Sequence, residues 1–379
     1  MTAASTKKQE ETFVSYIQSC QNRETGEYWH HGLNDLYGLR WDPADWNEET
    51  NQPANAKPKA KKTVERKIPI SHYALNGYKL SIPQDRIPEV YTKYAECIAR
   101  GEYLYLCEVP GKYSKLGFDL DIDGRPEEPS HPAEWPTPEQ AIGYVRTIQQ
   151  KTLKKFYPNH TDKLQCVILI AQADAKNRAG MKPKIGAHPF FYNLVADADT
   201  KERIWAHAIQ SLISTYGERP AGLALWEDVL DPQVFRTSLR MIGSRKMVPC
   251  PNCNAKKPTG KEFTVSRPCP KACGGTNRKI DEGRPYQVYA VLDSNGNLDT
   301  KKVEILKNMI YAVQMATLWV PPGTRPTPVT IPPDALLADA LRLMEDRPSQ
   351  ISVLPVVEGV GGVCLGLLRL HDIYRAGSA

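Results

Sequence analysis

Three aspartates alternate with apolar residues in one short stretch of the chain. Asp119, Asp121 and Asp123 are separated by Leu120 and Ile122, and this two-residue period is that of a β-strand with one buried face. The three carboxylates therefore share the other face, where neighbours lie about 6–7 Å apart. Unpaired carboxylates at that spacing repel one another and raise each other's pKa values. Because a divalent cation would remove this conflict, the stretch predicts a metal site.

Two other interpretations of this stretch stay open. Asp-x-Asp-x-Asp-Gly also begins an EF-hand calcium loop, but such a loop needs Glu at its twelfth position, where this chain has Ser130. The residues before Asp119 also indicate a strand and a turn rather than an entering helix. Alternatively, the three acids line the solvated edge of a strand and bind nothing.

A histidine further along the chain suggests a phosphate site. His188 begins an apolar strand and is held in an extended conformation by Pro189. Gly186 and Ala187 leave room beside it, and Lys184 precedes it. Small residues and a cation next to an imidazole predict phosphate binding, with a hydrogen-bonded structural histidine as the alternative.

The segment from Leu230 to Lys246 predicts a basic helix. Asp231 is placed as its N-cap, with proline at the first helical position. Arg236 and Arg240 are four residues apart, so they would share one helical face, where two guanidiniums can clamp a triphosphate. Gly243 would end the helix and present Lys246.

Four of the nine cysteines have metal-ligand spacing. The pattern C-x2-C-x15-C-x3-C predicts a zinc ribbon with a filled, structural site at Cys250, Cys253, Cys269 and Cys273. Between residues 236 and 284 there are twelve Lys and Arg against three Asp and Glu, a local excess of nine positive charges. This block indicates a polyanionic partner such as nucleic acid, with a solvated surface or simple folding support as the alternatives.

Composition excludes several classes of protein. With 41% hydrophobic and 24% charged residues, the 379-residue chain is of the globular type and long enough for two or three domains. It has no apolar run long enough to span a membrane, and its polar start lacks a signal-peptide core, so no membrane association is expected. The scattered remaining cysteines are typical of a reducing cytosol.

Apolar periodicity predicts the elements that would position these residues. Beside the acidic strand we expect strands from Tyr103 and at 166–171, 184–195 and 286–292, and helices at 139–157, 201–216 and 301–320. The mixture indicates an α+β or α/β domain from about 71 to 249. Residues 1–70 contain a possible short helix and a basic linker at 51–67, without assignable chemistry.

The ordered motifs resemble the archaeo-eukaryotic primase superfamily. An Asp-x-Asp strand, a small-x-His strand and an Asp before a segment ending Leu-Arg-Met-x-Gly-Ser-x-Lys occur in its order, as in primases of large DNA viruses of the herpes and pox type. The resemblance covers about 104–246 and extends through the cysteines to about 319. It implies an α+β primase-polymerase core with an RRM-like sheet, so that residues 71–320 would form one catalytic domain including the ribbon at 250–273.

The resemblance also assigns roles to single residues. Asp119, Asp121 and Asp231 would hold two catalytic Mg²⁺ or Mn²⁺ ions. His188 would contact the phosphates of the incoming nucleotide. The residues assisting it would be Lys184, Arg236, Arg240 and Lys246. The family more often has Ser where this chain has Gly186.

The implied activity is template-dependent nucleotidyl transfer, the synthesis of primers in DNA replication. Two ions would activate the 3′-hydroxyl and stabilise the leaving pyrophosphate. The implied partners are a single-stranded DNA template, nucleoside triphosphates and a replicative helicase, in the cytoplasm or the replication compartment of an infected host cell. The alternative is a non-catalytic nucleic-acid-binding replication protein that uses the ribbon and the basic block. The acid pair discriminates between them, because a binder has no need of it.

A Pro-rich linker at 321–333 precedes a different C-terminal segment, 334–379. A helix from Asp334, strands at 351–357 and 363–370 and a helix from His371 give a β-α-β-β-α pattern. This resembles a single CBS motif, half of the usual paired module, as in the tails of bacterial sugar-phosphate isomerases. The ribose-binding Asp of that family corresponds to Asp372, but Arg369 stands where Thr or Ser is expected.

Three expectations follow for this tail. The linker should keep it apart from the catalytic domain. The apolar face that a second repeat would cover should promote self-association. A ligand-sensing CBS-type regulator is a third hypothesis for the function of the chain.

Overall fold

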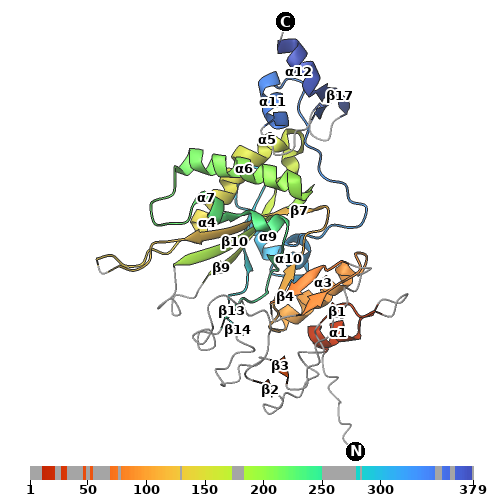
Figure 1. Cartoon of the computed structure of the whole chain (residues 1–379), viewed down its shortest axis with the longest axis vertical. Coiled ribbons are helices and arrows are strands. Elements are labelled where there is room, and N and C mark those ends of the chain that lie inside the picture. The colour runs from red at the N-terminus through yellow and green to blue at the C-terminus, as the bar shows by residue number, and fades with distance from the viewer. Residues whose placement is uncertain are drawn as a thin grey trace, which may run out of the picture. The chain divides into compact units, whose positions relative to one another are not determined.

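The structure is a computed structural model, and it describes residues 11–21, 27–31, 46–47, 52–53, 69–75, 78–128, 130–172, 183–249, 279–281, 284–345, 352–358 and 363–377. These form two compact units, residues 1–107 with 244–283 and residues 108–243 with 284–379, and each is considered by itself (Figure 1). The four predicted zinc-ligand cysteines and most of the predicted basic linker lie outside the described residues.

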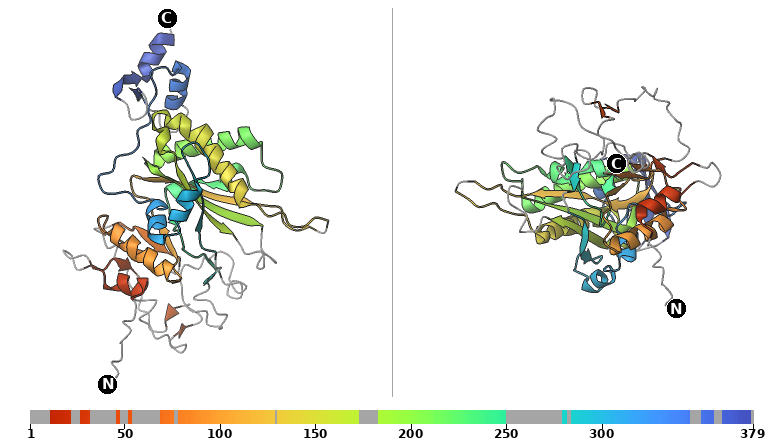
Figure 2. Two further views of the ribbon diagram at one scale, coloured as in Figure 1. Left: turned by 180° about the vertical axis from the view of Figure 1, so that it is seen from behind. Right: turned by 90° about the horizontal axis from the view of Figure 1, so that it is seen from below.

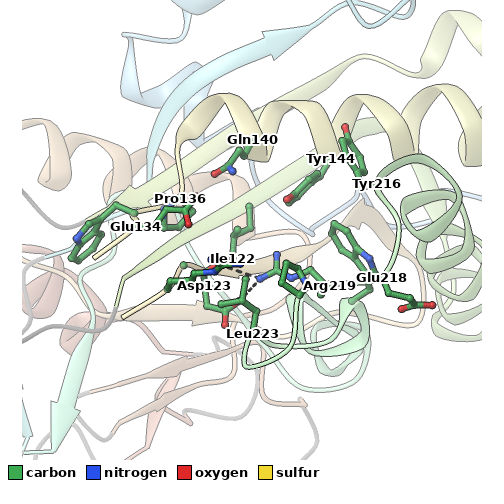
Figure 3. A pocket seen from close by; sticks show the side chains of 15 residues that line it. Ile122, Asp123, Glu134, Pro136, Gln140, Tyr144, Tyr216, Glu218, Arg219 and Leu223 are labelled. Carbon is green, nitrogen blue, oxygen red and sulfur yellow. Dashed lines mark hydrogen bonds and ion pairs between the residues drawn. The ribbon is translucent and has the colours of Figure 1, made fainter. Parts of the chain in front are cut away.

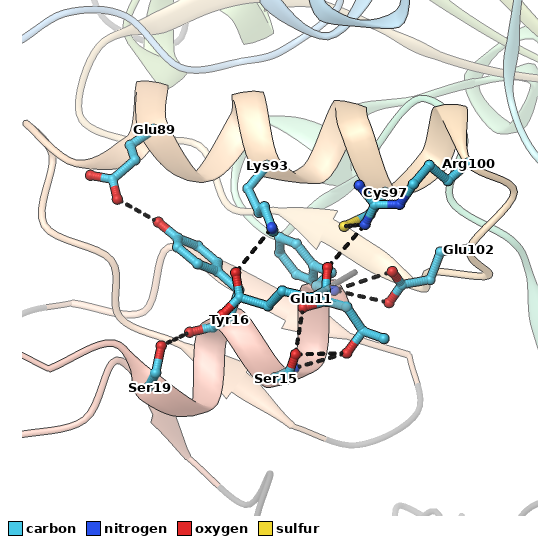
Figure 4. Close-up of polar contacts among 11 residues, drawn as sticks. Glu11, Ser15, Tyr16, Ser19, Glu89, Lys93, Cys97, Arg100 and Glu102 are labelled. Carbon is cyan, nitrogen blue, oxygen red and sulfur yellow. Dashed lines mark hydrogen bonds and ion pairs between the residues drawn. The ribbon is translucent and has the colours of Figure 1, made fainter. Parts of the chain in front are cut away.

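The described residues of the first unit form short strands and two helices. Its elements are β1 (His30–His31), β2 (Trp46–Asn47), β3 (Gln52–Pro53), β4 (His72–Ala74), β5 (Lys79–Leu80), β13 (Met247–Pro249), β14 (Lys279–Asp281), α1 (Phe13–Ser19) and α3 (Ile87–Ala99). Strand β6 (Leu106–Glu108) leads into the second unit. Helix α1 packs on α3, with Phe13 edge-on to Tyr94 and the Tyr16 hydroxyl donating to Glu89 Oε1 at 2.8 Å (Figure 4). The short helix expected in this region is confirmed.

The second unit is built on a six-stranded antiparallel sheet. The strand order is β11 (Leu230–Asp231), β8 (Asp119–Asp123), β10 (Lys184–Ala196), β9 (Cys166–Gln172) and β15 (Gln287–Leu292), with β7 (Ser114–Gly117) also paired to β10. Every pairing is antiparallel, so the fold class is α+β. On β8, Leu120 and Ile122 are buried and the three aspartates are partly exposed, as the alternation predicts.

Helices cover one face of this sheet. They are α4 (Pro138–Thr147), the π-helical turn η2 (Ile148–Leu153), α5 (Lys154–Phe156), η3 (Pro158–Lys163), α6 (Ala198–Tyr216) and α7 (Trp226–Val229) (Figures 1 and 2). A capping box begins α4, in which Thr137 and Gln140 bond each other's backbone N–H groups. The helices predicted at 139–157 and 201–216 are confirmed, the first with a π-helical interruption.

The basic helix predicted after Asp231 does not form. A 3₁₀ turn, η5 (Pro232–Phe235), is followed by the short strand β12 (Leu239–Arg240). Asp231 does cap its turn, since Oδ1 accepts from the Gln233 N–H at 2.9 Å. The backbone that follows pairs with a distant segment instead of forming a helix. The Gly243 N–H donates to the Tyr286 carbonyl at 2.8 Å. Pairing outside the segment thus outweighs its local helix signal.

The predicted helix at 301–320 is divided in two. Its parts are α9 (Thr300–Ile305) and α10 (Met309–Met315). The break occurs where Asn308 caps the second helix, its side-chain oxygen accepting from the Ile310 N–H at 3.0 Å.

The tail has its own small core. Its elements are α11 (Leu337–Glu345), β16 (Val353–Val357), β17 (Cys364–Arg369) and α12 (Leu370–Gly377). The core residues are Ile331, Ala340, Met344, Leu354 and Ile373. The first strand of the predicted pattern is a single parallel bridge between Ile331 and Val356, and the helix begins three residues after the expected Asp334.

The expectation that the linker keeps the tail apart is wrong. Asn159 of η3, which is buried, donates to the Thr330 hydroxyl and to the Val357 carbonyl, both at 3.1 Å. The Thr327 N–H donates to the carbonyl of Val195, at the end of β10, at 2.7 Å. The tail therefore packs on the unit that carries the acidic strand.

Candidate functional site

The register of the central strands gathers most of the predicted residues. Strand β8 lies between β11 and β10, with Asp231 opposite Asp119, Gly186 opposite Asp121 and Lys184 opposite Asp123. Residues directly opposite each other in an antiparallel pair have Cα atoms about 4.5–5.5 Å apart. Three carboxylates predicted to bind metal therefore occupy neighbouring positions on two strands.

The first two acids each contact a basic side chain. His188 Nε2 lies 3.3 Å from Asp119 Oδ1, and Lys184 Nζ lies 2.7 Å from Asp121 Oδ2. Burial by itself raises the pKa of Asp119, but the charge of His188, helped by Arg240 and Lys184, outweighs it and holds that pKa below its ordinary value. The rise in pKa expected for unpaired carboxylates therefore does not apply to Asp119, which has a basic partner.

The third acid has a different kind of partner. Asp123 forms an ion pair with Arg219, and its other carboxylate oxygen accepts from the Ala224 N–H at 2.9 Å. Arg219 also donates to the Asp123 carbonyl at 3.2 Å and to the Ala224 carbonyl at 3.1 Å. The Arg219 side chain is only 5% exposed. Asp123, to which the sequence assigned no separate role, thus fastens the loop between α6 and α7 to the strand.

His188 belongs to a stack of three side chains. Its ring lies on that of Tyr286, with 3.5 Å between the centroids. The Arg240 guanidinium in turn lies over the Tyr286 ring, 4.3 Å from its centroid. Burial, reinforced by the negative charge of Asp119, raises the pKa of Tyr286 above its usual range. A Cβ atom at Gly186 would lie 2.5 Å from the Tyr286 hydroxyl. Any side chain larger than that of glycine at this position would therefore meet the Tyr286 hydroxyl unless Tyr286 shifted.

Two predicted phosphate ligands are not brought to the acids by this unit. Arg236 is exposed and pairs with Glu202 and Asp199 of α6, whereas the predicted helix would have placed it beside Arg240. Lys246 belongs to the first unit. Sequence reasoning also missed Tyr286 and Arg219. The departure at Gly186 was the one signal that could have pointed to the tyrosine.

The residue types suit a divalent cation, although the described residues form no complete cage. Among the residues that the structure describes, no group of three or more His, Cys, Asp or Glu side chains is arranged to hold a metal ion. Asp119 Oδ1 is nevertheless buried, and its 3.3 Å contact with His188 Nε2 is an ion pair without hydrogen-bond geometry, while His188 Nδ1 is buried without a hydrogen-bond partner. Mg²⁺ is usually bound by one or two carboxylates together with substrate phosphates rather than by an all-protein cage. Asp119, Asp121 and Asp231 fit that mode of binding.

Comparison with protein families agrees with this geometry. Residues 71–257 match the model of the C962R protein N-terminal AEP domain. This segment is therefore similar to an archaeo-eukaryotic primase domain. Residues 324–379 match the CBS domain. The chain thus joins a primase-type domain to a CBS domain, and the resemblance seen in the sequence is confirmed for both. No curated protein matches the chain significantly.

A domain of this family implies an enzyme of the primase or nucleotidyltransferase type. Within the described part of the chain, no helix is long and apolar enough to cross a membrane. In the CBS domain, Arg369 pairs with Asp372, with Nη2 2.8 Å from Oδ1 and Nε 2.9 Å from Oδ2. Arg369, which stands where the CBS pattern has Thr or Ser, is therefore paired with Asp372, the position that binds ribose in that pattern.

Proposed function

We propose that this chain synthesises primers on single-stranded DNA from nucleoside triphosphates. The observation that carries the proposal is the register of β11, β8 and β10, which sets Asp231, Asp119 and Asp121 beside Lys184 and His188 within a primase-type domain. Carboxylates next to a lysine and an imidazole are what phosphoryl chemistry requires, because positioning and charge neutralisation supply most of its rate.

Asp119, Asp121 and Asp231 would hold two Mg²⁺ or Mn²⁺ ions, which when bound activate the 3′-hydroxyl and neutralise the leaving pyrophosphate. Without substrate, His188 and Lys184 contact Asp119 and Asp121. A nucleoside triphosphate offers both basic side chains phosphate oxygens instead. This exchange frees the carboxylates, so we expect nucleotide and metal to bind together. The Tyr286 ring would keep His188 oriented during the exchange.

The remaining parts of the proposal concern the template and the partners. Cys250, Cys253, Cys269 and Cys273 would hold a structural Zn²⁺, which elemental analysis of the purified protein tests. Arg236, Lys246 and the basic block around the ribbon would contact phosphates. A replicative helicase would supply the single-stranded template.

The test is incorporation of labelled nucleotides on single-stranded DNA with Mg²⁺ or Mn²⁺. Asp119→Asn should abolish synthesis while the protein stays folded, because a neutral amide cannot balance two cations. Asp228→Asn, the same change at an exposed position in α7, is the matched control and should keep full activity. Full activity of a folded Asp119→Asn protein would refute the two-metal mechanism.

A second candidate is a nucleic-acid-binding replication protein without catalysis. The observation that favours it is that Asp119, Asp121 and Asp123 each already have a basic partner. The same variants decide between the two. A pure binder makes no product, and removing a negative charge at Asp119 should leave its affinity for single-stranded DNA unchanged or raise it.

We further propose that the CBS domain mediates self-association rather than adenosine-nucleotide sensing. On β17, Leu365 and Leu367 are 54% and 63% exposed, on the face opposite Leu354 and Leu368 of the tail core. An uncovered apolar face of a two-stranded sheet offers a surface that the same face of a second copy can cover through a two-fold interface. The Arg369–Asp372 pair argues against ribose binding.

Sedimentation of the full chain tests the association. Leu367→Asp should shift the protein toward monomer and leave primer synthesis unchanged, because it buries a charge only in the dimer. Leu298→Asp, at an exposed leucine outside the tail, is the matched control and should associate like the wild type. A wild-type protein that is monomeric at every concentration would contradict the proposal.

A further inference from the structure

A cavity opens at the far end of the acidic strand. It has a volume of about 300 Å³ and begins at Ile122 and Asp123, one pleat beyond Asp121. Figure 3 shows Gln140 and Tyr144 on one side of it and Arg219 on the other. The volume is at the lower end of the range for ligand pockets and is enough for one planar ring system.

Aromatic side chains from three elements form one wall. The Tyr144 ring of α4 meets Tyr216 at the end of α6 and Trp226 of α7, each edge-on with 5.0 Å between the centroids. Trp226 is fixed, since it is buried and its Nε1–H donates to the Gly217 carbonyl at 2.9 Å. Tyr216 is 46% exposed and stands at the rim. The wall is therefore rigid inside and accessible at its edge.

The charges around the cavity disfavour a phosphate. Three carboxylates line it, Asp123, Glu134 and Glu218, against two guanidiniums, of which Arg219 is already paired with Asp123. An anion would meet a net negative surface. A neutral ring with polar edges meets no such penalty and finds hydrogen-bonding groups at the rim.

We propose that this aromatic pocket binds one unstacked base of a single-stranded nucleic acid held beside the acidic strand. The inference rests on the proposed function in one respect, that a nucleic-acid strand passes Asp121. Stacking on aromatic rings tolerates every base, so the pocket would hold the strand without reading its sequence.

Base pairing during synthesis favours the nucleic-acid template over the incoming nucleotide as the source of the base. In template-dependent synthesis the incoming base must face a template base, so it is not available to a pocket in the protein. An unpaired base of the template, outside the growing duplex, has no other partner. The aromatic pocket would thus bind the template next to the carboxylates.

The experiment measures binding of dye-labelled single-stranded DNA to the full chain by fluorescence anisotropy, without metal or nucleotide. Tyr216→Leu removes the exposed ring, and we expect about 5- to 150-fold weaker binding, the range of one base–aromatic stack. Tyr216→Phe keeps the ring and loses only the hydroxyl that contacts Thr147 at 3.2 Å, so it should bind nearly like the wild type. Tyr144→Leu is a second variant in case Tyr216→Leu fails to fold.

Templates with a single abasic site, placed at each position in turn, separate stacking from a general loss of affinity. One abasic position should weaken binding by the wild type but not by Tyr216→Leu, because the ring and the base act as a pair. Equal binding by wild type and both folded leucine variants would overturn the proposal. Weakened binding by the variants, with no position at which an abasic site weakens binding by the wild type, would also overturn it.

This readout is independent of catalysis. A chain that binds template through the pocket but makes no primers would refute the proposed function and keep the pocket. A chain that makes primers and binds template equally well with and without the Tyr216 ring would refute the pocket alone.

Discussion

The two ends of strand β8 carry the same residue type on the same face but use it differently. At one end, Asp119 and Asp121 contact His188 and Lys184 through single contacts of 3.3 and 2.7 Å. At the other end, Asp123 is bound by the Arg219 guanidinium and by a backbone N–H group. The acids differ in their partners rather than in their spacing.

The partners decide what each carboxylate can do. The Lys184 side chain is 38% exposed and can move to a substrate phosphate at little cost. Arg219 is 5% exposed and holds backbone carbonyls as well, so releasing it would leave a buried charge unpaired. An exchangeable partner suits a site that must accept cations and nucleotide, whereas a fixed partner suits a structural anchor.

The largest expected effect separates the two ends by activity. Asp121→Asn should lower the maximal rate of primer synthesis by at least about 100-fold, the effect of removing one electrostatic stabiliser from an active site. Asp123→Asn should act mainly on template affinity and stability, because it loosens the loop that carries Arg219. Steady-state kinetics at varied template concentration measures the maximal rate and the template dependence of both variants. If the two variants lose the same maximal rate, the comparison fails and all three acids belong to one site.

The second prediction tests the anchor by stability. Asp123→Ala should cost roughly 2–3 kcal/mol of unfolding free energy, less than the 3–5 kcal/mol of a fully buried pair because the carboxylate is partly exposed. Arg219→Met should cost a similar amount. The double variant should lose less than the sum of the two, since removing both partners leaves no buried charge. Urea unfolding of the four proteins measures the coupling, and additive losses would show that the pair is not an anchor.

The alternation of aspartates with apolar residues was enough to predict β8, because a strand with one buried face has only that pattern available. The strands β9 and β10 and the helix α6 followed from similar local patterns. Their register was not predictable. It is set by pairing between segments far apart in the chain, and it alone puts Asp231 opposite Asp119.

Local signals misled where long-range pairing decided the structure. Asp231 does cap a turn, but the backbone after it pairs with residues near Tyr286, and this separates Arg236 from Arg240. Arg219 and Tyr286 lie in segments without a motif, so no spacing could connect them with Asp123 or His188. These contacts appear only when the fold joins distant stretches.

The smallest expected effect sharpens the comparison at the functional end, where Gly186 lies opposite Asp121. In Gly186→Ala the new Cβ would lie 2.5 Å from the Tyr286 hydroxyl, and Tyr286 cannot simply turn away because it is buried and stacked on His188. We expect a loss of about 1–2 kcal/mol of stability, in the lower part of the range for overpacking.

Activity should fall in the same variant, because displacing the Tyr286 ring also displaces His188. Tyr286→Phe removes the oxygen atom that the new methyl group meets, so the double variant Gly186→Ala with Tyr286→Phe should recover both stability and synthesis relative to Gly186→Ala alone. Such recovery requires the two side chains to be in contact. If the double variant is no more stable and no more active than Gly186→Ala, the glycine is needed for another reason. In that case the stacking of Tyr286 on His188 is not what positions the functional end of β8.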